Sequence, residues 1–199
     1  MRILLPLCGK SVDLLWLWRH GHDVVGVEDF AKSISDFAAD SHLVPEDVNN
    51  NKSQDEEMQA IKECIGAEEM LSLLQSSFSP SNASGSPFTD HSFNAVWDRS
   101  AFVSMPPRYH GFYAEAIKRL LNWHDFRFML LVYEFDETAV KGPPYAVTQD
   151  RVRALFQDFA DIHRIYEAPL LFDARLSGSN QFSLSKTDVR EVVYLLRNK

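Results

Sequence analysis

The chain has 199 residues, of which 45% are hydrophobic, with 20 lysines and arginines against 28 aspartates and glutamates. This length predicts a single domain over residues 1–199 with one sizeable core, and it is short for two domains. The net charge of −8 argues against a nucleic-acid partner, since phosphate contacts need clustered lysine and arginine, so we expect a small-molecule partner. We also expect a monomer.

The N-terminus and the cysteines bear on the cellular compartment. An apolar run over residues 3–7 resembles the start of a signal peptide, but Lys10 and Asp13 interrupt it and no small-residue cleavage site follows. No apolar segment approaches the length of a membrane span. Only two cysteines occur, Cys8 and Cys64, which do not make a disulfide framework. We therefore expect a cytoplasmic protein with no membrane partner.

The first 28 residues predict a strand, a helix and a second strand. The strand Ile3–Leu5 ends before a turn at Cys8–Gly9, and helix-period apolar residues begin at Val12. The strand Asp23–Val27 then ends on the carboxylate of Glu28. Such a βαβ unit is a nucleotide-binding arrangement, in which the acid accepts hydrogen bonds from ribose hydroxyls, and the spacing of roughly twenty residues from turn to acid fits it.

The glycine content of the turn around Gly9 excludes some classes of ligand. A dinucleotide fingerprint needs three glycines, and only Gly9 is present. A phosphate-binding P-loop needs a glycine five residues before Gly9, where this chain has Leu4. What remains is a ligand with a ribose and no phosphate, of which S-adenosylmethionine is the commonest on this architecture. His20 and His22 have no third ligand nearby, so we expect no metal.

The next segment alternates between apolar and polar stretches. A second helix is predicted over Ala31–Ser41, followed by a flexible, solvated insertion over residues 45–63. Met70–Leu74 is short and apolar and predicts a third strand. A turn region rich in serine and proline follows over residues 76–87.

Regular elements return in the second half of the chain. A strand over Phe93–Trp97 precedes a helix that opens at Pro106 and Pro107 and runs to Leu121. Five consecutive apolar residues within Phe126–Tyr133 predict a central strand buried on both faces, as in parallel sheets.

The last elements complete the predicted sheet. After a loop around Gly142–Pro144, a helix is expected over Thr148–Phe159, and Ile162–Ala168 and Val189–Leu196 are expected to form an antiparallel pair. We therefore predict a doubly wound α/β fold with a mostly parallel sheet of about seven strands, an antiparallel C-terminal strand and helices on both faces. Ligands of such folds bind at the carboxyl ends of the strands.

Four segments resemble the thiopurine S-methyltransferases in wording, order and approximate spacing. They are Pro6–Ser11, Gly21–Glu28, Val96–Arg99 and Gly142–Pro144, and the likeness is weak only between about Asp29 and Ser92. The resemblance implies a Rossmann-like fold that uses S-adenosylmethionine to methylate a thiol on a small aromatic or heterocyclic molecule.

Two other functions remain open at this point. The acceptor could be another soft nucleophile, such as a small thiol, hydrosulfide, or a selenium or tellurium species. The chain could also be a non-catalytic relative that binds S-adenosylmethionine, because members of the family usually carry a preceding segment that folds over the cofactor. Here a core strand begins at the second residue, so we expect that lid to be absent.

Methyl transfer to a thiolate is a direct displacement that needs alignment of donor and nucleophile rather than a catalytic triad. The backbone of Leu7 lies where it could meet the amino-acid or sulfonium end of the cofactor, the alternative being a core leucine in a loop. Glu28 is expected to bind the ribose, because a buried strand end rarely carries an unpaired carboxylate, and the alternative is a surface acid. By resemblance, Ser77 and Phe78 stand where related enzymes hold the adenine, and the alternative is a plain turn.

The remaining predicted site residues face the acceptor. By resemblance, Arg99 reaches both cofactor and substrate, and its permanent charge would stabilise a thiolate as a catalytic residue, the alternative being an ion pair with Asp98. Arg175 matches a second arginine on the substrate side of the family. Pro144 is expected at the rim of the substrate pocket, since consecutive prolines fix φ in the loop, and the alternative is a plain connector.

Overall fold

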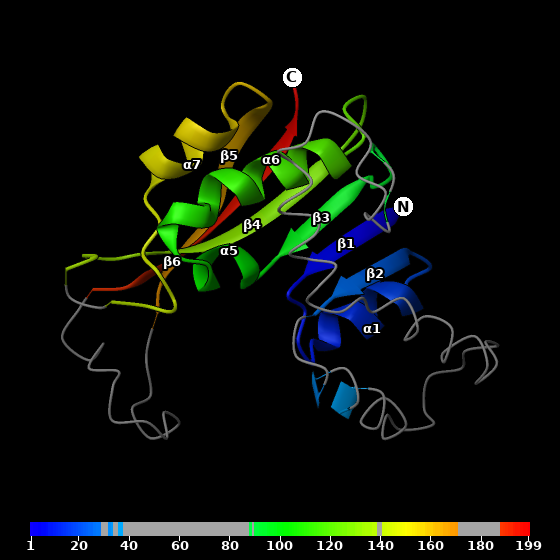
Figure 1. Cartoon of the computed structure of the whole chain (residues 1–199), viewed down its shortest axis with the longest axis horizontal. Helices are drawn as coiled ribbons and strands as arrows, with labels where there is room; N and C mark the ends of the chain where they lie inside the picture. The colour runs from blue at the N-terminus through cyan, green and yellow to red at the C-terminus, as the bar shows by residue number, and fades with distance from the viewer. Residues whose placement is uncertain (29–31, 34–35, 38–87, 89, 139–140, 171–187) are drawn as a thin grey trace. The chain divides into compact units, whose positions relative to one another are not determined.

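The computed structural model describes residues 1–28, 32–33, 36–37, 88, 90–138, 141–170 and 188–199 (Figure 1). The chain forms two compact units, one from Met1–Trp97 with Arg119–Asn122 and the other from Asp98–Lys118 with Trp123–Lys199. The single domain expected from the chain length stays a prediction.

The first unit contains the predicted strand–helix–strand. Its elements are β1 (Arg2–Pro6), α1 (Val12–Arg19), β2 (Asp23–Val27) and β3 (Ala95–Asp98, whose last residue belongs to the second unit). The three strands are parallel, with β1 between β2 and β3 (Figure 1). The carboxyl ends of β1 and β2 therefore lie side by side.

Apolar side chains hold this unit together. Leu5 and Val24 are buried in the strands, and α1 adds Leu14 and Trp18 to the same apolar cluster. Ser11 caps α1 by accepting a hydrogen bond from the Asp13 backbone N–H at 3.2 Å. Because the cap and the apolar face both lie within one short stretch, the local sequence determines where α1 begins and how it packs.

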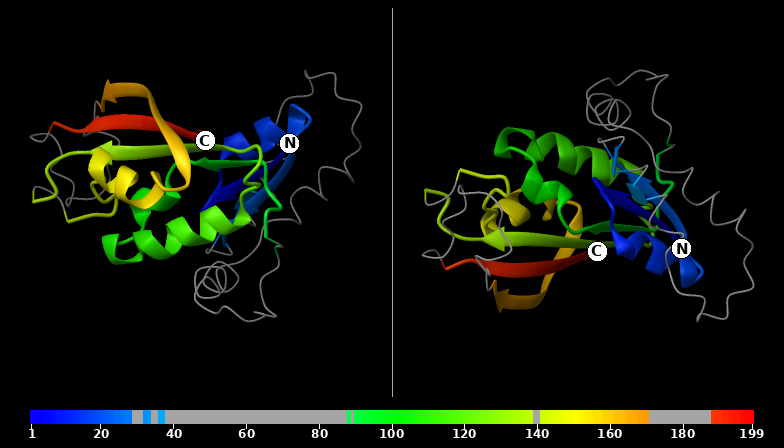
Figure 2. Two further views of the ribbon diagram at one scale, coloured as in Figure 1. Left: turned by 90° about the horizontal axis from the view of Figure 1, so that it is seen from above. Right: turned by 90° about the horizontal axis from the view of Figure 1, so that it is seen from below.

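The second unit is built around an antiparallel ribbon. Its elements are α5 (Ala101–Ser104), the 3₁₀ helix η2 (Pro107–Tyr109), α6 (His110–Leu120, which ends in the first unit), β4 (Arg127–Glu134), α7 (Gln149–Phe156), β5 (Ala160–Pro169) and β6 (Arg190–Asn198). Strand β6 lies between β4 and β5 and runs antiparallel to both (Figure 2). Arg164 of β5 and Leu130 of β4 both stand opposite Tyr194 of β6.

Aromatic side chains form much of the core of the second unit. Phe102 of α5 contacts the rings of Tyr113 and Phe156, and Phe128 of β4 meets Phe156 edge to face. All four side chains are at most 1% exposed. These ring contacts hold Phe102 in place, and with it the segment α5 that follows β3.

The fold class is confirmed as mixed α/β with an antiparallel C-terminal strand. The described residues hold six strands, whereas about seven were predicted. The predicted strand Met70–Leu74, the insertion 45–63 and the turn 76–87 lie outside the described residues. Within the predicted helix Ala31–Ser41, the four described residues are helical.

One local expectation was wrong, and one short helix was not predicted. Strand β4 is not buried on both faces, since Phe128, Leu130 and Val132 are buried whereas Met129 and Leu131 are only half-buried. The alternation fits an antiparallel partner and one partly open face, which consecutive apolar letters do not reveal. The helix α5 was not predicted, because four residues are too few to show a helical period.

Candidate functional site

The turn after β1 folds back onto the end of β2. The Cys8 backbone N–H donates to the Val27 carbonyl at 2.9 Å, directly beyond the paired strands. Leu7 and Gly9 both have positive φ, of 44° and 53°. A positive φ is uncommon for a leucine and marks a backbone held by its surroundings. The turn is therefore tightly shaped at the place where the sequence predicts a cofactor contact by Leu7.

Glu28 closes the same end of the sheet. Its side chain is buried, and Oε2 accepts a hydrogen bond from the Gly9 backbone N–H at 2.7 Å. The prediction that this buried acid needs a partner is met in part by the protein itself. An ionised carboxylate has about four acceptor positions, so a bond to the Gly9 N–H is compatible with further bonds to ribose hydroxyls. A role for Glu28 in ribose binding stays a prediction that this geometry supports.

In the second unit, Asp98 is a buried acid at the start of the segment that carries Arg99. It is 1% exposed and accepts hydrogen bonds from the Phe102 backbone N–H, at 3.3 Å to Oδ1 and 3.2 Å to Oδ2. The Tyr113 hydroxyl donates to Oδ2 at 2.5 Å. Burial raises the pKa of Asp98 to about 6, although these hydrogen bonds oppose the increase. The alternative of a plain ion pair with Arg99 does not account for these bonds.

The side chain of Arg99 is exposed, and its charge affects the pKa of Tyr133 near the end of β4. Burial raises the pKa of the Tyr133 hydroxyl, the charge of Glu191 raises it further, and the charge of Arg99 lowers it. The guanidinium of Arg99 is thus close enough to Tyr133 to be felt electrostatically. This brings a permanent cation to the carboxyl end of a strand, where ligands of doubly wound folds bind.

The loop with Gly142, Pro143 and Pro144 is attached to both neighbouring elements. The Tyr145 backbone N–H donates to the Val103 carbonyl of α5 at 2.6 Å, and the Val147 N–H donates to the Tyr133 carbonyl at 2.9 Å. Gly142 has a φ of 69°, and a Cβ there would lie 2.5 Å from the Tyr145 ring. Arg99, the end of β4 and the half-buried Pro144 therefore belong to one connected region, and their role on the acceptor side stays a prediction.

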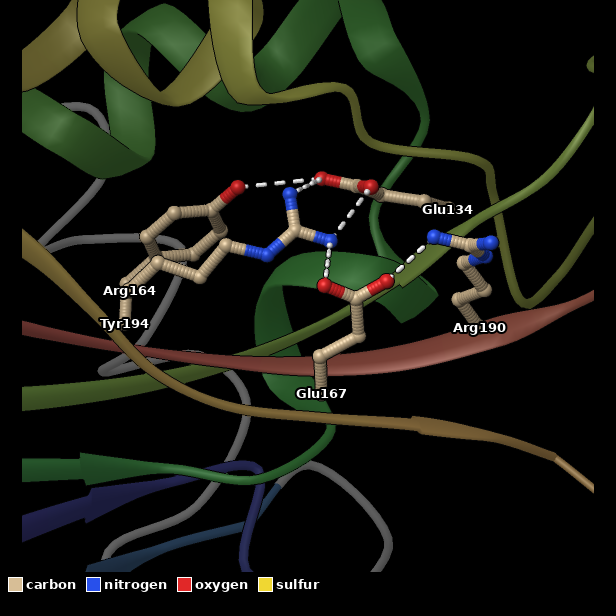
Figure 3. Close-up of polar contacts among 5 residues, drawn as sticks. All are labelled: Glu134, Arg164, Glu167, Arg190 and Tyr194. Atoms are coloured by element: carbon tan, nitrogen blue, oxygen red, sulfur yellow. Dashed lines mark hydrogen bonds and ion pairs between the residues drawn. The ribbon is translucent and has the colours of Figure 1, made fainter.

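A series of ion pairs and hydrogen bonds links β5 and β6 to the carboxyl end of β4. Figure 3 shows Glu134 accepting from the Arg164 guanidinium, at 3.1 Å and 3.4 Å, and from the Tyr194 hydroxyl at 3.0 Å. Arg164 also pairs with Glu167 at 2.9 Å, and Glu167 pairs with Arg190. The charges alternate along β4, β5 and β6, so they neutralise one another and fix the ribbon rather than attract a ligand.

Comparison with known proteins decides the family. The family model described as thiopurine S-methyltransferase matches residues 1–199, the whole chain. The chain belongs to this family. The resemblance found in four short segments is therefore confirmed. The family and its structural neighbours are S-adenosylmethionine-dependent methyltransferases.

Three family members are 29% to 35% identical to the chain over the aligned residues. A thiopurine S-methyltransferase of Mus spretus is 35% identical over 204 residues, covering 100% of this chain and 76% of its own length. A probable thiopurine S-methyltransferase of Danio rerio is 31% identical, covering 78% of this chain and 63% of its own length. The enzyme of Pseudomonas fluorescens strain SBW25 is 29% identical, covering 78% and 64%. The matched part is thus under two thirds of the length of the last two relatives.

Solved structures support the fold. A SAM-dependent methyltransferase from Methanosarcina mazei matches 99% of this chain and 92% of its own, with a TM-score of 0.61 and 14% identity. An arsenic(III) S-adenosylmethionine methyltransferase from Chlamydomonas reinhardtii matches 100% of this chain and 64% of its own, with a TM-score of 0.63 and 15% identity. At such low identity these likenesses speak for the fold alone.

The family's predicted site is described only in part. Ser77, Phe78 and Arg175 lie outside the described residues, so their roles stay predictions. Sequence reasoning missed Tyr113 and Tyr133. A signal existed for Tyr113, because a tyrosine on the buried face of a helix needs a partner for its hydroxyl. For Tyr133 no signal existed, since its place beside Arg99 arises only from the tertiary fold.

Two further observations concern metals and membranes. Within the described ranges, no group of three or more histidine, cysteine, aspartate or glutamate side chains is placed to hold a metal ion. In the same part of the chain, no helix has both the length and the apolar character needed to cross a membrane.

Proposed function

We propose that the protein is an S-adenosylmethionine-dependent S-methyltransferase that methylates the thiol of a small aromatic or heterocyclic acceptor, acting as a cytoplasmic monomer. The observation that carries the proposal is the buried carboxylate of Glu28, held by the Gly9 backbone at the end of β2 in a chain that matches this family throughout.

The residues of the first unit fit the cofactor. Glu28 accepts the Gly9 N–H and is expected to accept hydrogen bonds from the two ribose hydroxyls as well. Leu7, whose φ is positive, is proposed to contact the methionine part of the cofactor through the backbone of the turn. Ser77 and Phe78 are proposed to hold the adenine. When bound, S-adenosylmethionine supplies an electrophilic methyl group on a positively charged sulfur.

The chemistry is one displacement at carbon. The acceptor thiol first loses its proton to solvent. A lone pair of the thiolate sulfur then forms the new S–CH₃ bond while the bond between the sulfonium sulfur and the methyl carbon breaks, and its electron pair stays on the sulfur of S-adenosylhomocysteine. Arg99 is proposed to favour the anionic thiolate over the thiol, because a nearby cation lowers an acid's pKa. Arg175 is proposed to add a second cation, and Pro144 to limit the space open to the acceptor.

The test is product analysis with a panel of acceptors. The protein is incubated with methyl-labelled S-adenosylmethionine and a mixture of heteroaryl thiols, aliphatic thiols, hydrosulfide and selenium and tellurium species, and the products are identified by mass spectrometry. We expect label on heteroaryl thiols first. Label only on hydrosulfide or on the selenium or tellurium species would assign another soft nucleophile. Binding of S-adenosylhomocysteine without label on any acceptor would assign a non-catalytic relative.

A further inference from the structure

The proposed function uses Arg99 but leaves its neighbour Asp98 without a role. Asp98 is a carboxylate that is 1% exposed, and its pKa is raised to about 6. Burying a carboxylate costs free energy unless hydrogen bonds or opposite charges compensate. A neutral asparagine has a single acceptor oxygen, whereas the carboxylate of Asp98 uses both oxygens to accept from the Phe102 N–H and the Tyr113 hydroxyl.

The geometry connects Asp98 to the backbone on both sides of Arg99. Asp98 lies one residue before Arg99, and its carboxylate accepts the N–H of Phe102, three residues after it. The Tyr113 hydroxyl, from the buried face of α6, holds Oδ2 at 2.5 Å. The turn carrying Arg99 is thus tied to α5 through Phe102 and to α6 through Tyr113. A change at the carboxylate would release both ties.

Among the described residues of its unit, few groups face Asp98. From α5, only backbone N–H groups reach it, and from α6 the titratable partner is Tyr113, whose pKa burial raises well above its usual value. His110 of α6 stacks on Phe102, and burial lowers its pKa. Arg99 is the adjacent cation, and its side chain is exposed.

We propose that Asp98 and Tyr113 form a positioning pair that orients Arg99 toward the acceptor, and that ionisation of Asp98 is required for the productive orientation. This inference rests on the proposed function, because it gives Arg99 an acceptor to face. The anionic carboxylate accepts both the Phe102 N–H and the Tyr113 O–H. Once protonated, it offers a hydrogen of its own and weakens that pair of bonds.

The expected signature is an acid limb in the pH profile. With an acceptor that does not itself titrate between about pH 5 and 8, kcat/KM should fall below the pKa of Asp98. Carbon-13 NMR of protein labelled at aspartate carboxyl carbons measures that pKa directly. The Asp98 signal, assigned by its loss in Asp98→Asn, should titrate with the same midpoint as kcat/KM. Midpoints more than about one pH unit apart would overturn the inference.

Variants separate positioning from structural support. Tyr113→Phe removes the donor that lowers the pKa of Asp98, so both midpoints should move up together by roughly 1 pH unit. Tyr109→Phe is the matched control, since Tyr109 is 41% exposed on η2, and both midpoints should stay in place. Asp98→Asn should lower kcat/KM roughly tenfold at pH 7.5 and abolish the acid limb.

The outcomes distinguish this inference from the proposed function. If Arg99→Ala leaves methylation of every acceptor unchanged, the role of Arg99 itself is wrong. If Arg99→Ala lowers the rate but the Tyr113→Phe profile keeps the wild-type midpoint while its NMR midpoint moves, the positioning pair is wrong. Should Tyr113→Phe fail to fold, comparison of the wild-type NMR and kinetic midpoints still decides the question.

Discussion

At the scale of single residues, Glu28 carries the cofactor assignment. Its carboxylate accepts the Gly9 N–H at 2.7 Å, so a test must separate this bond from the ribose contact. Glu28→Ala should weaken S-adenosylhomocysteine binding by about 1 to 3 kcal/mol, because the ribose donors lose their acceptor. Glu28→Gln keeps one acceptor for Gly9 and should lose less. Isothermal titration calorimetry measures both, and unchanged affinity in the alanine variant would remove Glu28 from the site.

Arg99 is tested by the charge of the acceptor. A guanidinium beside a thiolate is a charge-assisted contact worth about 1.5 to 3 kcal/mol, so Arg99→Ala should lower kcat/KM roughly 10- to 150-fold for anionic thiolates. Neutral acceptors should lose less. Arg99→Lys keeps the charge without the planar donor fork and should fall between wild type and alanine. Equal losses for anionic and neutral acceptors would contradict thiolate stabilisation.

Part of this site could be predicted from the sequence. Glu28 was predicted from its place at the end of a β-branched strand, roughly twenty residues after the turn, and the structure puts its carboxylate on that turn. Asp98 was seen only as a possible ion-pair partner. Its tie to Tyr113 joins residues 15 apart, from a strand end to a helix face. A single sequence without a fold does not determine such a pairing.

At the scale of elements, the loop after β4 depends on Gly142. Its φ of 69° strains any other residue, and an alanine Cβ would lie 2.5 Å from the Tyr145 ring, whose backbone N–H is held by Val103. Gly142→Ala should therefore cost about 2 to 3 kcal/mol of unfolding free energy and raise KM for the acceptor. Gly21→Ala is the matched control, with a φ of 82° and nothing within 4 Å of its Cβ.

Gly21→Ala should lose only about 1 kcal/mol of unfolding free energy, since the positive φ is unfavourable for alanine but its Cβ meets no other atom. It should also leave KM for the acceptor unchanged. Chemical denaturation and steady-state kinetics together give both quantities. If Gly21→Ala and Gly142→Ala prove equal in stability and in KM, the contact with Tyr145 has no role in shaping the loop.

The charge chain at the end of β4 tests how the ribbon is fixed (Figure 3). Glu134→Ala removes the acceptor of the buried Tyr194 hydroxyl and of Arg164, and should cost about 1 to 3 kcal/mol. The exposed pair of Lys32 and Asp36 is the comparison, and Asp36→Asn should not measurably change the unfolding midpoint. Urea denaturation measures both variants, and equal effects would show that burial of Tyr194 adds nothing.

At the scale of the whole molecule, prediction from sequence succeeded where the signal is local. The last two strands were predicted over Ile162–Ala168 and Val189–Leu196, and the structure has them as an antiparallel pair over Ala160–Pro169 and Arg190–Asn198. The partly open face of β4 was missed, because it depends on which strand lies beside it. Periodicity records the burial of a segment, whereas strand neighbours are set by the chain as a whole.

The pH dependence of global stability follows from Asp98. Its pKa rises from 3.8 to about 6 on folding, so between these values the native state keeps a proton that the unfolded chain has released. Stability then falls as pH rises, by roughly 3 kcal/mol over this range relative to Asp98→Asn, which lacks the titration. Asp158 has the opposite effect on the pH dependence of stability. A hydrogen bond from Lys118 lowers its pKa, so its contribution to the unfolding free energy is lost as pH falls.

Denaturant titrations of wild type, Asp98→Asn and Asp158→Asn from pH 3 to 8 measure how the unfolding free energy changes with pH in each protein. If wild type and Asp98→Asn keep a constant difference in unfolding free energy across this range, Asp98 does not change its proton affinity on folding, and the ionisation step attributed to it in positioning Arg99 loses its basis.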